Sequence, residues 1–151
     1  KNSPLYEQAK KVLSDYSKNI IESLHQLKNT NISGYDNSKE SIALTRKNIR
    51  AAGFQDYIKL TLADAQTLIP ESPEGLIFCN PPYGERIGEL ASLEKLYYNL
   101  GENLKRNFKG YSAWIFTGNP DLRKKISLRT EKRITFYNGP IECRLLKYSL
   151  F

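Results

Sequence analysis

The chain has 151 residues, of which 40% are hydrophobic and 26% are charged, a composition that is typical of one soluble globular domain and excludes a disordered chain. No apolar run approaches the length of a membrane span and no charged-then-apolar leader opens the chain, so we expect no membrane segment. The net charge of +7 favours a polyanionic partner such as a nucleic acid, although charge alone is equally compatible with a well-solvated basic surface.

Residues that bind metals or form disulfides are scarce. The chain has two cysteines, Cys79 and Cys143, and one histidine, His25. Two cysteines are too few for a disulfide framework, and a zinc site needs clustered Cys and His ligands, so we expect no metal. Cysteines that stay reduced are most simply explained by a cytoplasmic protein.

The amino-terminal half is predicted to alternate helices with strands. Residues 4–28 carry apolar side chains at spacings of three and four, which predicts one long amphipathic helix. A short strand is expected at 31–36, followed by a helix that begins after Ser38 and ends at Gly53. Residues 58–63 predict the next strand.

The carboxyl-terminal half continues this alternation. Residues 76–79 predict a short buried strand, and residues 93–107 predict an amphipathic helix with Ser92 as its N-cap. A buried strand is expected at 111–117, followed by a short helical turn that starts at Asn119. The last two strands, at 133–137 and 142–149, are joined by a tight turn at Asn138-Gly139-Pro140.

This order predicts an α/β fold with a largely parallel sheet, closed by an antiparallel hairpin at one edge. Ligands of such sheets bind outside the carboxyl ends of the strands. Asp36, Asp64 and Asn80 each end an apolar strand, so we expect these three residues on one rim. Asp36 can accept hydrogen bonds from both hydroxyls of a ribose, and Asp64 can accept one from the amine of an adenine. Taken singly, each acid is also compatible with a helix cap or an ordinary loop position.

The segment Asn80-Pro81-Pro82-Tyr83 has a more specific chemistry. A residue before proline is kept out of the helical region, and proline fixes its own φ, so this loop is stiff. The side-chain oxygen of Asn80 and the carbonyl of Pro81 then offer two acceptors to a planar NH2 group, and Tyr83 offers a face on which a base can stack. A plain strand terminator explains the two prolines but not the Asn and Tyr that flank them.

Methylation of a nucleobase amine needs such a loop. The nitrogen lone pair is delocalised into the ring, and two acceptors can turn it toward an electrophilic methyl group by positioning and charge stabilisation, without a strong base. The base must be flipped out of a helix or lie in an unpaired stretch to reach the loop. The sequence therefore predicts amino-methyl transfer to a nucleobase.

The Asn80-Pro81-Pro82-Tyr83 segment resembles the (N/D/S)PP(Y/F/W) motif of S-adenosylmethionine-dependent amino-methyltransferases. Its extension "NPPYGERIG" at residues 80–88 and the terminal "NGPIEC" at residues 138–143 are similar to the THUMP-containing 23S rRNA guanine-N2 methyltransferases of bacteria, which are often labelled N6-adenine-specific DNA methylases. The likeness covers essentially the whole chain, from about Leu5 to Phe151.

The resemblance implies a Rossmann-like class I methyltransferase sheet, with S-adenosylmethionine as cofactor and large-subunit ribosomal RNA as partner. It implies that Asp36 binds the cofactor ribose and that Asp64 and Ala65 meet its adenine. The resemblance also implies that Asn80, Pro81, Pro82 and Tyr83 are the catalytic residues. Asn80 is expected to contact the cofactor as well.

Two parts of that family's pattern are not found in these residues. They are the glycine-rich turn after the first strand, which holds the methionine part of the cofactor, and the THUMP domain. The resemblance therefore implies that residues 1–151 are the carboxyl-terminal portion of a single catalytic domain. The amino-terminal part of the same protein is then expected as a partner that supplies the first, central strand.

Other functions remain open from the sequence. An adenine-N6 DNA methyltransferase would use the same loop, whereas a glutamine methyltransferase of release factors would not need the basic patches at residues 105–109 and 123–133. A non-catalytic RNA-binding fragment is the alternative from another class. Carbon-5 methylation of a pyrimidine is disfavoured because it needs a thiolate, and Cys79 is expected at the buried end of a strand.

Overall fold

The computed structural model describes residues 4–26, 31–83 and 90–151, with the side chains of 20–26 excepted. The chain forms two compact units. The first comprises Lys1–Gly34 and Arg46–Leu60, and the second comprises Tyr35–Thr45 and Thr61–Phe151.

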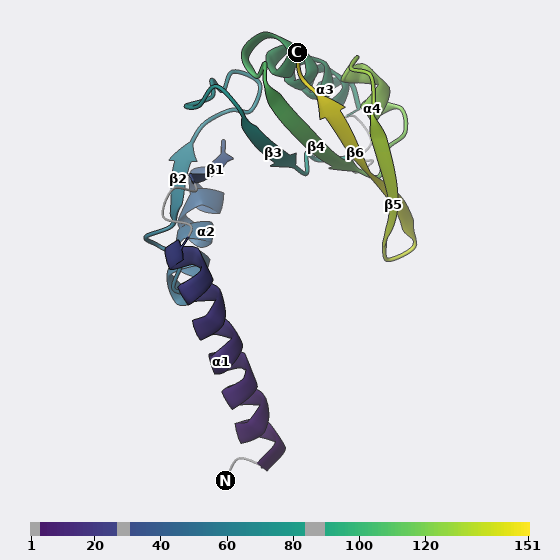
Figure 1. Cartoon of the computed structure of the whole chain (residues 1–151). Coiled ribbons are helices and arrows are strands. Elements are labelled where there is room, and N and C mark those ends of the chain that lie inside the picture. Colours follow the sequence, from purple (N-terminus) through teal and green to yellow (C-terminus); the bar gives the residue numbers. More distant parts are fainter. Residues whose placement is uncertain (1–3, 27–30, 84–89) are drawn as a thin grey trace. The chain divides into compact units, whose positions relative to one another are not determined.

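The helices and strands follow the predicted order (Figure 1). Most predicted boundaries agree to within one or two residues, but the predicted start of one helix is wrong. The helix expected at 93–107 begins at Leu90, so Ser92 lies in its first turn and is not its N-cap. The described elements are α1 (Pro4–Gln26), β1 (Ile32–Asp36), α2 (Lys39–Ala51), β2 (Ile58–Leu62), β3 (Gly75–Cys79), α3 (Leu90–Asn107), β4 (Tyr111–Thr117), α4 (Leu122–Lys125), β5 (Lys132–Asn138) and β6 (Ile141–Ser149).

Strands β1 and β2 pair in a two-stranded sheet. A Cβ atom on Gly34 would lie 2.7 Å from Cδ2 of Leu60, so a larger residue here would require the Leu60 side chain to shift. Two residues further along β1, the carbonyl of Asp36 accepts a hydrogen bond from the Ala63 N–H at 2.9 Å. The residue numbers of both partners rise together, from Gly34 with Leu60 to Asp36 with Ala63, so the two strands run parallel. A helical crossover such as α2 connects parallel strands.

Helix α2 connects these strands and has the predicted ends. The Ser38 hydroxyl accepts a hydrogen bond from the Ser41 N–H at 3.1 Å, which is the geometry of an N-cap. Gly53 follows the helix with a φ of +79°, a left-handed conformation that glycine adopts without a Cβ clash. Its N–H bonds to the Arg50 carbonyl at 3.1 Å and satisfies one of the last carbonyls of the helix.

The second sheet has four strands in the order β3-β4-β6-β5. β3 is parallel to β4, whereas β6 is antiparallel to both β4 and β5. The hairpin between β5 and β6 turns at Gly139-Pro140, next to the paired residues Asn138 and Ile141. Gly139 has a φ of +60°, which explains a glycine at this position. The predicted edge hairpin is confirmed, and β3 forms the other edge of the described sheet.

A helical layer covers one face of this sheet and forms the core. The side chains of Tyr97 and Leu122 are fully buried there, and the Tyr97 hydroxyl bonds the Thr117 hydroxyl at 2.9 Å. Burial raises the pKa of Tyr97 to about 12. The buried cluster comprises Leu93, Tyr97, Leu100, Leu104, Phe108, Ala113, Ile115, Leu122, Ile126, Leu146, Tyr148 and Leu150.

Alternate positions of β3 have opposite environments. Ile77 packs against the core, whereas Leu76 and Phe78 are 69% and 68% exposed. This strand therefore presents apolar side chains to solvent in the described part of the chain. Of the described helices, none combines the length and the hydropathy of a membrane span.

Candidate active site

Asp36 lies where the sequence placed it, at the carboxyl end of β1. One carboxylate oxygen, Oδ1, accepts the Ser38 N–H at 2.8 Å, and the side chain is exposed. This bond orients the carboxylate. Within the described part of the chain no hydrogen bond to Oδ2 is recorded, so this oxygen can accept one from a ligand. An acid held in this way at a strand end fits the hydroxyls of a ribose.

Asp64 lies just after β2, within one residue of the backbone bond between Ala63 and Asp36. The N–H of Gln66 donates to its Oδ1 at 2.8 Å, and the Gln66 side-chain amide donates to both carboxylate oxygens at 3.2 and 3.1 Å. A carboxylate has about four acceptor positions, so Asp64 keeps capacity for the amine of an adenine. The two predicted acids therefore come together at the ends of neighbouring strands.

Asparagines on α3 hold the loop that contains Asp64. Asn103, which is 6% exposed, donates from one amide to the carbonyls of Ala65 and Leu68, each at 2.9 Å. Asn99 donates to the Gln66 side chain at 2.9 Å. The sequence reasoning missed these residues, although asparagines at positions 99, 103 and 107 lie one helical turn apart on one face.

The predicted acceptor loop follows β3 directly. Asn80 is exposed, Pro81 is buried and Tyr83 is half-buried. The buried proline anchors the loop while the Asn80 side chain remains accessible, which is the arrangement that an amine-binding loop requires. The prediction for "GERIG" at residues 84–88 falls outside the described residues.

The ring of Tyr83 is held by the end of β4 and by the terminal hairpin. It packs edge to face on Phe116 with ring centres 6.3 Å apart, and its hydroxyl accepts from Asn138 at 3.4 Å. The Cys143 thiol lies 3.8 Å from the same hydroxyl. A Cβ on Gly118 would lie 2.9 Å from the Tyr83 ring, so glycine is required for this contact. The "NGPIEC" segment thus positions the aromatic residue of the loop.

The two cysteines are free, and Cys79 is half-buried. Cys143 is fully buried, and burial raises the pKa of the Cys79 thiol. A thiol with a raised pKa is a poor nucleophile, which argues against carbon-5 methylation through Cys79.

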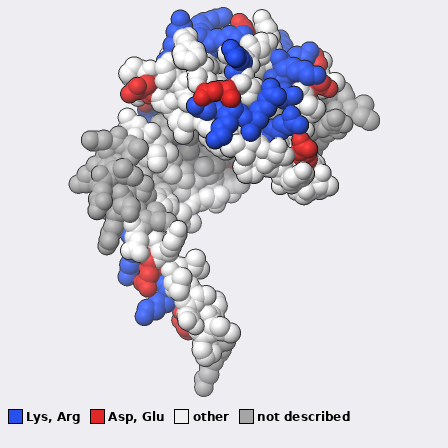
Figure 2. Space-filling model, turned by 45° about the vertical axis from the view of Figure 1, so that its right-hand side comes forward, with Lys and Arg blue, Asp and Glu red and all other residues white. Residues whose placement is uncertain are grey.

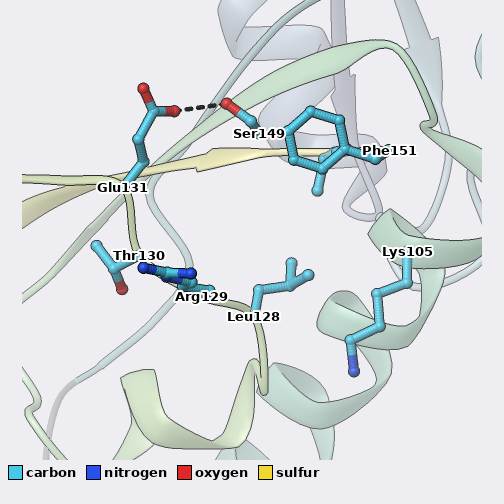
Figure 3. Close-up of a pocket in the computed structure, with 8 residues that line it drawn as sticks. Lys105, Leu128, Arg129, Thr130, Glu131, Ser149 and Phe151 are labelled. Atoms are coloured by element: carbon cyan, nitrogen blue, oxygen red, sulfur yellow. Dashed lines mark hydrogen bonds between the residues drawn. The ribbon is translucent and has the colours of Figure 1, made fainter.

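A cavity of about 690 Å³ (Figure 3) borders Ser149, which lies at the opposite end of β4 from this loop. It is bordered by Lys105, Arg129 and Ser149, and Glu131 bonds Ser149 across it. Ser149 pairs with Ser112 at the start of β4, whereas Asn80 follows Cys79, which pairs with Ile115 near the end of that strand. Because ligands of such sheets bind at the carboxyl ends of the strands, we do not assign catalysis to this cavity.

Comparison with known proteins places the chain in a family. A 42% identical relative, the "Ribosomal RNA large subunit methyltransferase K/L" of Syntrophotalea carbinolica, aligns over 78% of this chain but only 17% of its own length. The structure of SMU.472, a methyltransferase complexed with SAH, matches 80% of this chain and 32% of its own, with a TM-score of 0.73 and 30% identity. A possible methylase from Clostridium difficile 630 matches 82% of this chain and 33% of its own, with a TM-score of 0.74 and 29% identity.

These matches confirm the predicted α/β methyltransferase fold and the predicted enzyme class. The model of one family, described as RMKL-like, methyltransferase domain, matches residues 4–147. The chain therefore belongs to the UPF0020 family of RMKL-like methyltransferase domains.

Proposed function

We propose that this chain is part of an S-adenosylmethionine-dependent enzyme that methylates the N2 amine of a guanine in large-subunit ribosomal RNA. The observation that carries the proposal is the loop after β3, where accessible Asn80 and buried Pro81 are followed by a Tyr83 that the terminal hairpin holds in place. The name of the relative from Syntrophotalea carbinolica supports a ribosomal RNA substrate. Guanine N2 as the target rests on the resemblance of "NPPYGERIG" and "NGPIEC".

In this proposal the chain's residues divide into two groups. Asp36 accepts hydrogen bonds from the cofactor ribose, and Asp64, with Ala65 beside it, faces the adenine. Asn80 and the Pro81 carbonyl accept the two hydrogens of the target amine, so its lone pair points at the methyl group that S-adenosylmethionine supplies. The target base stacks on Tyr83. Whether Asn80 shares one site with the two acids stays a prediction.

Methyl transfer to purified nucleic acids tests the substrate. Radioactive S-adenosylmethionine is supplied with deproteinised, unmethylated ribosomal RNA or with unmethylated duplex DNA. We expect label in the RNA, and nuclease digestion should release N2-methylguanosine. Label in the DNA as N6-methyladenine would favour the adenine-N6 alternative instead.

Two substitutions test this division of roles. They are made in the native-length protein, by which we mean the longer protein of which this chain is proposed to be a part. Asn80→Ala should abolish transfer and leave the affinity for S-adenosylmethionine nearly unchanged, because Asn80 acts mainly on the target amine. Asp36→Ala should weaken cofactor binding, by about 1.5–3 kcal/mol if it loses a charged hydrogen bond to the ribose. Titration calorimetry and initial rates separate the two effects. Equal loss of binding and transfer in Asn80→Ala would instead indicate a structural role.

We also propose that the amino-terminal part of a longer protein completes this domain in the cytoplasm. The chain corresponds to only 17% of the first relative's length, and β3 leaves Leu76 and Phe78 exposed at the edge of the described sheet. A strand added beside β3 would pair its free backbone groups, and neighbouring helices would cover its apolar face. The glycine-rich cofactor loop and a THUMP domain belong to that part in this proposal.

A further inference from the structure

Most of the chain's net positive charge lies in its last 30 residues. From Leu122 to Phe151 the sequence has eight Lys and Arg residues and only two acids, Glu131 and Glu142, whereas the whole chain has a net charge of +7. Figure 2 shows lysine and arginine side chains gathered on one face of the larger unit. The charge therefore belongs mainly to the segment that runs from α4 to β6 and is not spread evenly along the chain.

Two of these arginines line a small cavity at the carboxyl end of β4. The cavity has a volume of about 190 Å³, and Arg123 and Arg144 are its basic residues. Arg144 lies opposite Thr117, the last residue of β4. The other lining residues are Thr117, Gly118, Asn119, Pro120 and Glu142. We call this cavity the arginine pocket.

Both guanidinium groups are oriented by neighbours, and among the contacts within residues 4–26, 31–83 and 90–151 each retains donors that are not used. Arg144 donates from Nε and Nη2 to one oxygen of Glu142, at 3.2 and 2.9 Å. Arg123 donates from Nε to the carbonyl of Pro120 at 3.2 Å. Each guanidinium has five N–H donors, so each keeps several for a ligand. The ion pair with Glu142 is partly exposed, and exposed ion pairs are weak, so Glu142 does not prevent the remaining donors of Arg144 from binding an anion.

The arginine pocket adjoins the loop after β3. Gly118 lines the pocket, and a Cβ on this residue would touch the Tyr83 ring at 2.9 Å. The pocket and the predicted base-stacking face are thus separated by a single glycine. The pocket is therefore close enough to Tyr83 to receive a phosphate that neighbours a base stacked on this ring.

We propose that the arginine pocket binds the phosphodiester backbone of single-stranded RNA next to the nucleotide whose base enters the active site. This inference rests on the proposed function and extends it, because it says where the substrate strand runs. Arginine forks match phosphate oxygens bidentately, which a lysine cannot do. The pocket holds the strand in register and leaves recognition of the base to Asn80 and Tyr83.

Salt-dependent RNA binding tests this proposal in the native-length protein. The probe is a short, fluorescein-labelled single-stranded RNA with one guanosine, titrated in the presence of SAH and followed by fluorescence anisotropy. Each phosphate contact to a single strand contributes about 0.7 to the slope of log K against log salt, between about 50 and 200 mM salt. Arg123→Ala and Arg144→Ala should each lower this slope by about 0.7 and weaken binding about fivefold near 0.1 M salt.

Lys109→Ala is the matched control. Lys109 is an exposed cation just before β4, so it lies at the opposite end of the strand from Thr117 and outside the pocket. We expect it to leave the slope unchanged. Arg144→Lys should leave the slope of log K against log salt unchanged, because the positive charge remains. Its affinity for the RNA should fall, because lysine lacks the bidentate guanidinium group. Unchanged affinity for SAH in all four variants shows that each is folded.

The possible results separate this inference from the proposed function. Slopes that fall equally in Lys109→Ala and the arginine variants would overturn the inference, because the charge would then act without a defined pocket. Slopes that stay at the wild-type value in the arginine variants would also overturn it, even if the enzyme methylates RNA. If the wild type transfers no methyl group to ribosomal RNA, the proposed function fails, and the binding slopes still decide the role of the pocket.

Discussion

Asn103 is a buried polar residue that holds the loop containing Asp64, which we propose to face the cofactor. Its amide bridges the carbonyls of Ala65 and Leu68, and its oxygen accepts from Asn107 at 2.7 Å. A buried asparagine with all of these bonds is stable, whereas its removal leaves two loop carbonyls without a donor. Asn103 is therefore a positioning residue for the loop that contains Asp64.

We expect Asn103→Ala to lower the free energy of unfolding by about 1–3 kcal/mol, because the hydrogen bonds to the Ala65 and Leu68 carbonyls are lost. The affinity for S-adenosylmethionine should fall in parallel, because the Asp64 loop loses its anchor. Urea denaturation and titration calorimetry measure the two quantities. Asn107→Ala serves as the control, since it removes one bond to Asn103 but leaves the loop carbonyls satisfied. An equal effect of both substitutions on cofactor affinity would contradict the positioning role.

At the scale of elements, α3 and the end of α4 approach each other unusually closely. A Cβ on Gly101 would clash with the backbone carbonyl of Ile126, the residue that follows α4. Glycine in a helix interior costs about 1 kcal/mol relative to alanine, so its presence here is explained by packing and not by helix propensity. This contact seats Leu122 and Ile126 in the core.

Gly101→Ala should therefore destabilise the protein, against the direction that helix propensity predicts. Backbone must move to accept the new methyl group, and overpacking of this kind costs about 1–3 kcal/mol in unfolding free energy. Lys95→Ala, at an exposed position of the same helix, is the control and should change stability by less than about 0.5 kcal/mol. Thermal or urea denaturation measures both. A stabilised Gly101→Ala variant would show that the two helices separate readily.

At the scale of the whole molecule, the exposed apolar side chains of β3 test whether other parts of a longer protein cover this sheet. Phe78 is 68% exposed within the chain as described. If the rest of a longer protein covers the sheet, Phe78 is in the core there, and large aromatic residues in a core contribute much more to stability than exposed ones.

The same substitution should then have different effects in the two contexts. Phe78→Ala should cost about 3–5 kcal/mol in the native-length protein, the range for a buried aromatic residue. In the isolated 151-residue chain it should change the unfolding free energy by less than about 1 kcal/mol. S-adenosylmethionine should bind saturably to the native-length protein and not to the isolated chain. Equal effects of Phe78→Ala in both contexts, or full binding by the isolated chain, would refute the proposed completion of the domain.

Local sequence patterns were enough to predict the helices and strands, the terminal hairpin and the candidate residues. Helix α2 illustrates this, since Ser38 and Gly53 occur where the capping and left-handed positions require them. The loop after β3 was predictable because strand termination accounts for the prolines of "NPPY" but not for the Asn and Tyr beside them. The start of α3 was misplaced because Ser92 is a good cap residue by type, and no local pattern forbids a helix from starting earlier.

The residues that support the site from a distance became apparent only in the folded chain. Asn103 bonds residues 35 and 38 positions earlier in the chain, and the Asn138 side chain reaches Tyr83 across 55 positions. The arginine pocket likewise joins Arg123 of α4 with Arg144 of β6. Propensity and spacing act over a few residues, whereas these contacts depend on how strands are ordered in the sheet and how α3 packs on it. The sequence therefore predicted the chemistry of the loop from local residue types, whereas the contacts that support the loop depend on tertiary packing.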